Sequence, residues 1–261
     1  MKITFDSNVW QIICLPNDFI LTESESSLEG FKKIRQAILD KRIEAFLSET
    51  IFTIEAINKD ERQNYLGSRK PKVETKEHPI TGNTHSFTLT IGPEKGIDFN
   101  GRAVLKKYFD EAIKLGFKIA SLPRISGMKN EEIETVIYKQ NEDELLKYLD
   151  KVVEIVQKIE NKGAGMAQIE KIGKQYDTIN WHKGLNKSPE AENTKIAKAA
   201  AEWADGDSVA ISIALGCDYF CTRDQAKGAG SKSVLSANNL AWLNSDYGFK
   251  TILPENLAKL I

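Results

Sequence analysis

Two aspartates of this 261-residue chain stand directly after short apolar stretches. Asp6 follows residues 2–5, KITF, and Asp224 comes shortly after the apolar centre of DYFCTRD at 219–221. Both apolar runs predict short strands that end next to a carboxylate. Because ligands gather outside the carboxyl ends of strands in a parallel α/β sheet, we expect both aspartates at one edge of such a sheet.

Two further acids are expected on helices next to these strands. Glu55 lies in IFTIEAIN, which predicts a helix after a second strand at 43–47. Asp207 opens SVAISIAL, which predicts a helix that leads into the strand before Asp224. An acid at a helix start is often only a cap, and a Glu on a helix is often solvated. The joint pattern of four acids at converging element ends carries the prediction.

Four carboxylates in one place predict a bound cation. Two like charges about 4 Å apart repel by roughly 4 kcal/mol at an effective dielectric constant of about 20. Oxygen-only ligands suit Mg²⁺ or Mn²⁺, which keep several waters. Such an ion activates water and neutralises charge on a phosphodiester. The chemistry expected of this cluster is therefore metal-dependent hydrolysis.

Strand-like and helix-like stretches alternate at both ends of the chain, which is typical of a parallel sheet covered by helices. The middle differs, because residues 67–102 are rich in Gly, Pro, Lys and Thr and predict a hairpin, and 142–160 predict an amphipathic helix. We therefore expect a core with insertions of β-hairpin and helical character. The core is expected at 1–62 and 195–261 with a strand at about 117–124, and the insertions at about 63–116 and 125–194.

Composition narrows the class of protein. A formal net charge of −1 with 28% charged residues argues against a broadly basic nucleic-acid-binding surface. The odd cysteine count, with Cys14, Cys217 and Cys221, indicates reduced thiols. No stretch approaches the roughly 20 apolar residues of a membrane span. We expect a soluble, cytoplasmic protein that does not contact a membrane.

At these residues the chain resembles the PIN-domain family of metal-dependent ribonucleases. FDSNVW is similar to the opening strand of that family, with Asp6 as the first acid and Asn8 as a polar residue two positions later. SETIFTIEAI is similar to the helix that carries the second acid, here Glu55. DGDSVAISIALGCDYFCTRD is similar to a helix and strand that would supply the remaining site residues, Asp207, Asp224 and the neighbouring Thr222.

The resemblance implies a three-layer α/β/α fold with a central parallel sheet. The inserted β-hairpin and helical segment in the middle of the chain have no counterpart in that family. The resemblance also implies Mg²⁺ or Mn²⁺ as cofactor and RNA as the substrate, with its phosphodiester bonds hydrolysed. Asp205 competes with Asp207, and Glu49 with Glu55. We favour Asp207 because it directly starts the SVAISIAL face, and Glu55 because it lies about two turns into its helix.

Residues after the last acid could support substrate binding. Arg223 would contact a scissile phosphate or pair with a nearby acid. QAKGAGSKS at 225–233 offers backbone N–H groups, with Lys227 and Lys232, to a phosphate. The alternative is a flexible surface loop.

Two other functions compete with a ribonuclease. One is a catalytically inactive PIN-like module that binds RNA or protein. The other is a phosphatase of the haloacid-dehalogenase type, which normally has a second Asp where this chain has Asn8. The sequence does not determine whether the protein forms a homodimer. It also leaves open three biological roles: a toxin paired with an antitoxin or other protein inhibitor, RNA processing, and defence.

Overall fold

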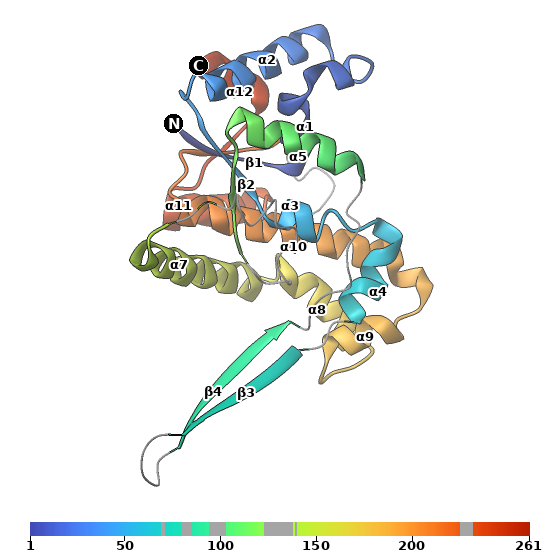
Figure 1. The fold of residues 1–261 in the computed structure, drawn as a ribbon. Helices are drawn as coiled ribbons and strands as arrows, with labels where there is room; N and C mark the ends of the chain where they lie inside the picture. The colour runs from blue at the N-terminus through green and yellow to red at the C-terminus, as the bar shows by residue number, and fades with distance from the viewer. Residues whose placement is uncertain (69–70, 80–84, 94–102, 123–137, 139, 225–231) are drawn as a thin grey trace.

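A five-stranded, all-parallel sheet lies at the centre of the structure, a computed structural model (Figure 1). It describes the chain except residues 69–70, 80–84, 94–102, 123–137, 139 and 225–231. The strands of this sheet are β1 (Lys2–Phe5), β2 (Glu44–Ser48), β5 (Lys118–Ala120), β6 (Tyr219–Cys221) and β7 (Thr251–Ile252). Each contains buried apolar side chains, as expected for strands of a parallel sheet.

The strands of the sheet lie in the order β5-β2-β1-β6-β7. From β1 the chain adds β2 and β5 on one side, and later β6 and β7 on the other. Ile3 of β1 lies opposite Ala45 of β2 and Tyr219 of β6. The strand order reverses between β1 and β6, and such a reversal is where α/β sheets bind ligands. Residues just after β1 and β6 therefore stand at the favoured position.

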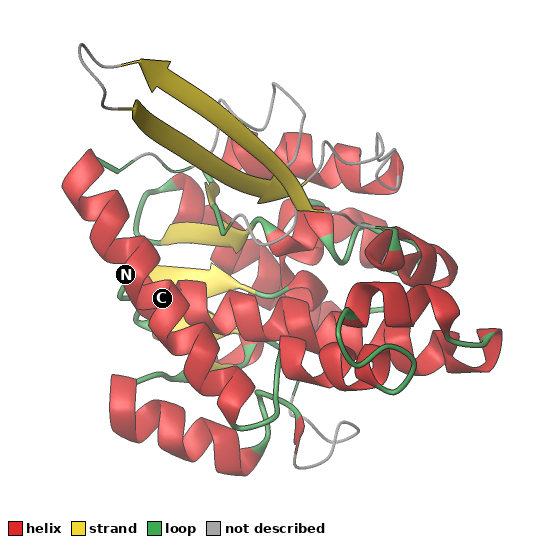
Figure 2. Cartoon of the chain, turned by 90° about the horizontal axis from the view of Figure 1, so that it is seen from below, coloured by secondary structure: helices red, strands yellow, loops and turns green. Residues whose placement is uncertain are grey.

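Helices cover both faces of the sheet (Figures 1 and 2). One face packs against α1 (Ser7–Cys14), α2 (Glu25–Leu39), α5 (Ala103–Leu115) and α12 (Pro254–Leu260). The other face packs against α7 (Glu142–Asn161), α10 (Asn193–Ala214) and α11 (Ala237–Tyr247). Side chains alternate between the faces, so Ile3 and Phe5 join the first core while Phe46 and Phe220 join the second. The fold is thus α/β, with a helix layer on each side.

A third apolar core lies beyond the sheet. It joins the first half of α10 to three short helices, a group that we call the helical unit: α4 (Arg62–Gly67), α8 (Met166–Lys174) and α9 (Trp181–Lys187). Ile54, directly after α3 (Thr50–Thr53), also packs in this core. Buried polar side chains bind it together, since Gln63 Nε2 donates to the Leu185 and Ser188 carbonyls at 3.0 and 2.8 Å. Arg62 Nη1 donates to the Ala197 carbonyl at 2.7 Å. Single 3₁₀ turns complete the connections: η1 (Pro16–Phe19), η2 (Lys59–Glu61) and η3 (Glu190–Glu192).

Within the helical unit, α8 and α9 approach each other through glycine. A Cβ atom on Gly184 would lie 1.9 Å from the Gly173 carbonyl oxygen. We expect Gly184→Ala to lower the free energy of unfolding by about 1 to 3 kcal/mol, because backbone must shift to admit the methyl group. Gly30→Ala, on α2, is the matched control. A Cβ atom on Gly30 would meet only Ala258 of α12, at an ordinary contact distance of 3.5 Å. Urea unfolding of both variants tests this, and equal stability would contradict it.

A two-stranded antiparallel hairpin projects from the body (Figures 1 and 2). It is formed by β3 (Pro71–Pro79) and β4 (His85–Pro93), paired from Pro71 opposite Pro93 to Pro79 opposite His85. The hairpin lies in the chain between β2 and β5, where the sequence predicts one.

The structure differs from the sequence-based expectations in three elements. Residues 193–214 form one continuous helix, so Asp207 lies inside a helix and does not open one as predicted. The helix after β2 ends at Thr53, so Glu55 lies on the following turn and not inside a helix. Both α5 and α7 pack on the sheet although they fall within the ranges predicted as insertions. No helix in the described ranges is both long and apolar enough to cross a membrane.

Candidate active site

Asp6 lies at the end of β1, where it caps α1 and is only 5% exposed. Its Oδ1 accepts a hydrogen bond from the Ser7 backbone N–H at 2.6 Å. Its Oδ2 accepts from Asn8 Nδ2 at 2.9 Å and from the Thr222 hydroxyl. Burial raises the pKa of Asp6, the hydrogen bonds from Thr222 and Ser7 oppose that rise, and the charge of Asp224 adds to it. The carboxylate is therefore held in one orientation.

Hydrogen bonds tie the carboxyl ends of β1 and β6 together. The Asp6 N–H donates to the Cys221 carbonyl at 3.0 Å, and the Arg223 N–H donates to Asn8 Oδ1 at 3.2 Å. The Asp224 N–H donates to Thr222 Oγ1 at 2.9 Å, and Asp224 lies just past the end of β6. Asp6 and Asp224 thus lie at the same sheet edge, as the sequence predicts, and the Asp224 side chain is exposed there.

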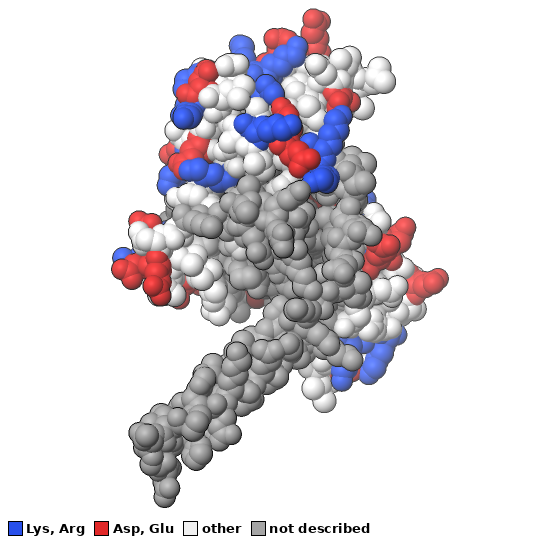
Figure 3. Space-filling model, in the orientation of Figure 1, with Lys and Arg blue, Asp and Glu red and all other residues white. Residues whose placement is uncertain are grey.

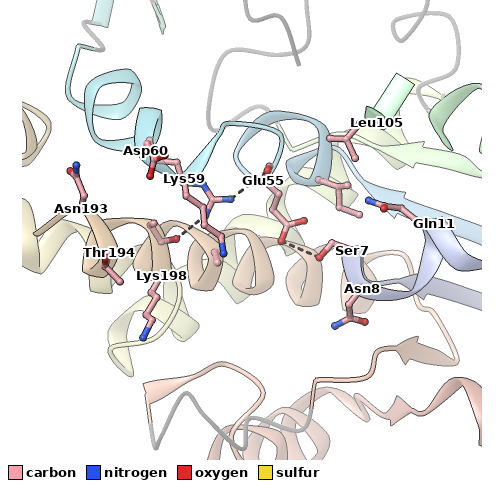
Figure 4. A pocket seen from close by; sticks show the side chains of 14 residues that line it. Ser7, Asn8, Gln11, Glu55, Lys59, Asp60, Leu105, Asn193, Thr194 and Lys198 are labelled. Carbon is pink, nitrogen blue, oxygen red and sulfur yellow. Dashed lines mark hydrogen bonds between the residues drawn. The ribbon is translucent and has the colours of Figure 1, made fainter. Parts of the chain in front are cut away.

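Glu55 reaches the same region from the other side of β1. Ser7 Oγ donates to Glu55 Oε1 at 3.2 Å (Figure 4). The Glu55 carbonyl accepts from Arg62 Nη2 at 3.4 Å, so the turn after α3 is anchored to the helical unit. Although it lies on a turn, the half-buried Glu55 side chain still points toward the start of α1.

Asp205 is the acid of α10 that faces this group. Its side chain is half-buried, and its pKa lies well above that of an exposed aspartate. Burial is the largest cause, followed by the negative charges of Asp6, Glu55, Glu202 and Asp224. The negative charges that raise the pKa of Asp205 thus come from the end of β1, the turn after α3, α10 itself and the end of β6.

Asp207 lies elsewhere. Two residues correspond to about 200° around an α-helix, so Asp207 points to nearly the opposite side of α10 from Asp205. It is 1% exposed. Burial is the largest cause that raises the pKa of Tyr148, and the negative charges of Glu49 and Asp207 add to the rise. The structure does not bring Asp207 together with Asp6, and the competing choice, Asp205, takes the position expected for it.

Glu49 belongs to the Asp207 side of the molecule. It is 2% exposed and accepts hydrogen bonds from the Ser121 hydroxyl and from the Leu122 N–H at 3.1 Å. These bonds tie the end of β2 to the end of β5. Of the two acids weighed for the second position, Glu55 is the one near Asp6.

Glu202 is an acid near the site that the sequence-based prediction omits. It lies three residues before Asp205 on α10, and burial is the largest cause that raises its pKa. Its Oε2 accepts from the Val234 N–H at 3.3 Å. The spacing of three residues places it on the same helix face as Asp205, and that spacing is the signal that would have identified it.

The supporting residues named from the sequence have different positions. Arg223 Nη1 and Nη2 each donate to Glu23 at 2.6 Å, and its guanidinium lies 4.8 Å from the Phe31 ring centroid. Arg223 therefore fastens the end of β6 to α2, in agreement with the structural alternative. Lys232 is exposed, and its carbonyl accepts from Gln168 Nε2 at 2.9 Å. Lys227 lies outside the described residues.

The acids match a divalent cation in ligand type and charge. Their carboxylate oxygens are the donors that Mg²⁺ and Mn²⁺ prefer. The raised pKa of Asp205 among four other acids is the physical sign that positive charge would be favourable there. Among the described side chains, however, no three or more His, Cys, Asp or Glu are already arranged closely enough to hold a metal.

Comparison of the chain with protein-family models, with curated proteins and with solved structures finds no match.

Proposed function

We propose that the chain is a PIN-like ribonuclease that depends on Mg²⁺ or Mn²⁺ and hydrolyses RNA phosphodiester bonds. The observation that carries the proposal is the hydrogen bonding of Ser7 and Thr222, which connects Asp6 to Glu55 and to the backbone of Asp224. Burial and the negative charges of these three acids also raise the pKa of Asp205. These acids come from separated parts of the chain, and Asp6 and Asp224 follow the two strands between which the strand order reverses. The choice of RNA as the substrate rests on the resemblance of the sequence to PIN domains.

In this proposal, Asp6, Glu55, Asp205 and Asp224 hold the ion. When bound, a divalent ion supplies positive charge against the phosphodiester and promotes ionisation of the attacking water. The chain's own contribution is orientation, since Ser7, Asn8 and Thr222 fix both oxygens of Asp6 before any ligand arrives. Ser7 also donates to Glu55, so one residue positions two acids.

Asn8 favours a nuclease over a phosphatase of the haloacid-dehalogenase type. That class needs a proton donor two residues after the first Asp. Here the position is an amide that donates to Asp6 and accepts from the Arg223 N–H. Asn8 therefore supports Asp6 and has no acidic proton to give to a leaving group.

Cleavage of total RNA and of a labelled single-stranded RNA with Mn²⁺ tests the proposal. We expect Asp6→Asn to reduce the cleavage rate by about 10²-fold to 10³-fold while circular dichroism stays unchanged, because the variant loses an oriented carboxylate that would hold the cation. Asp246→Asn, an exposed acid on α11, is the matched control and should cleave normally. Undiminished cleavage by pure, folded Asp6→Asn would refute the assignment.

A further inference from the structure

A cleft of about 490 Å³ opens beside the carboxylates (Figure 4). One end is formed by the start of α1, with Ser7 and Asn8, and Glu55 lies along it. The other end is formed by η2 and the first turns of α10, with Lys59 and Lys198. The cleft therefore leads from the acid cluster onto the helical unit.

The spacing of residues on α10 connects the two regions. Thr194, Lys198 and Ala201 line the cleft, and they follow one another at intervals of four and three residues. Asp205 continues the same helix face four residues later. Lys198 and Asp205 are seven residues apart, which is about 10 Å along the helix axis. A stacked nucleic-acid strand advances about 3.4 Å per nucleotide, so this distance corresponds to about three nucleotides.

Positive charge in the cleft is available to a ligand. Lys59 and Lys198 are exposed, and neither forms a salt bridge with any residue that the structure describes. Over the upper helices in Figure 3, Lys and Arg lie beside Asp and Glu. Lys32, for example, pairs with Glu29 at 2.7 Å. Asp60 also lines the cleft, but two cations without a salt bridge to the described residues are the groups expected to contact phosphates.

The cleft also offers amide groups. Oδ1 of Asn193 is buried and accepts no hydrogen bond from the described residues. Gln11 lines the opposite wall with a second side-chain amide (Figure 4). A buried acceptor without a partner costs about 1 to 3 kcal/mol, which a hydrogen-bonding ligand would recover. Amides both donate and accept, so they match the edges of nucleotide bases.

We propose that this cleft binds single-stranded RNA, with Lys59 and Lys198 on backbone phosphates and Asn193 and Gln11 on base edges. The inference rests on the proposed function, because it places the strand on the path that leads to the acid cluster. Base edges are free for such contacts only in an unpaired strand. The residues that line the described cleft include no aromatic side chain, so hydrogen bonds and not stacking hold the bases.

Binding to a fluorescein-labelled 12-nucleotide RNA, single-stranded or annealed to its complement, tests the inference by anisotropy. All proteins carry Asp6→Asn so that the RNA stays intact. The double variant Lys59→Ala/Lys198→Ala is compared with Lys158→Ala/Lys195→Ala, which removes two lysines that pair with Glu154 and Glu192. Each lost phosphate contact should lower the slope of log K against log salt by about 0.7. The cleft variant should therefore bind the single strand about 25-fold more weakly at 0.1 M salt, while the control binds normally.

The outcomes separate this inference from the proposed function. Equal binding by the cleft variant and the control would overturn the inference, even if wild-type protein cleaves RNA. A duplex bound as tightly as the single strand, with the same dependence on Lys59 and Lys198, would overturn the choice of a single strand. Selective loss of single-strand binding would support the inference even if no cleavage is observed, in which case only the proposed function fails.

Discussion

Asp205→Asn should reduce RNA cleavage by about 10²-fold to 10³-fold, whereas Asp207→Asn should leave the rate per folded molecule unchanged. The two substitutions are chemically identical and lie two residues apart. They differ because Asp205 is influenced by the charges of Asp6, Glu55 and Asp224, while Asp207 contributes to the surroundings of Tyr148 on the other side of α10. Comparison of the two variants therefore tests which side of α10 contributes to the proposed cleavage.

The comparison requires a measurement of folding as well as of rate. Asp207 is 1% exposed, so its replacement is expected to cost about 1 to 3 kcal/mol of stability. Thermal unfolding and circular dichroism give the folded fraction to which each rate is normalised. If Asp207→Asn loses cleavage as completely as Asp205→Asn while fully folded, the assignment of Asp205 is wrong.

The metal-free protein should become more stable when Asp205 is replaced by Asn, by about 1 to 2 kcal/mol at pH 8. The pKa of Asp205 is raised in the folded state, so folded protein binds more protons than unfolded protein between pH 3.8 and the raised value. The free energy of unfolding therefore falls as pH increases through that window. Asn carries no charge, so the variant does not lose stability in this pH window. Its gain in the free energy of unfolding over the wild type should therefore be largest at pH 8 and absent near pH 4.

Urea unfolding with EDTA at pH 4, 6 and 8 measures this effect. Saturating Mn²⁺ should stabilise the wild type, by about 2.7 kcal/mol at one hundred times its dissociation constant, and should stabilise Asp205→Asn less. Asp246→Asn again serves as the control with one surface charge removed. A variant that is less stable than wild type at pH 8 would show that the charge of Asp205 does not destabilise the metal-free protein.

The sheet edge could be predicted from the sequence because short apolar runs end next to acids. KITF and the apolar centre of DYFCTRD became β1 and β6, and Asp6 and Asp224 follow them at one edge. The local sequence is enough to predict these strands, because a buried strand is a short run of apolar residues and the first charged residue after the run indicates its end. The parallel arrangement follows from the helices between the strands.

The choice between Asp205 and Asp207 could not be predicted in the same way. Asp is a good helix cap and Gly206 a poor helix former, so the local sequence favours a helix that starts there. Tertiary packing overrides this preference, because a Cβ on Gly206 would lie 3.1 Å from Gly165 Cα and the glycine permits that close contact inside α10. Once α10 is continuous, its phase decides which acid faces Asp6.

The packing of the middle of the chain could not be predicted from the sequence either. An amphipathic pattern predicts the helix at α7, but it does not identify the partner of the apolar face. Both faces of a parallel sheet must be covered, and α5 and α7 serve that need although they lie in the predicted insertions. The structure thus assigns parts of the unmatched region to the sheet layers.

Because α10 runs through two apolar cores, the molecule should unfold cooperatively. Ile196 and Trp203 in its first half are buried in the helical unit, and Val209 and Ile213 in its second half are buried against the sheet. Melting of either core would expose one half of the same rigid helix and weaken the other. We therefore regard the helical unit as inseparable from the sheet, and deletion of α8 and α9 as a route to misfolding and not to a minimal enzyme.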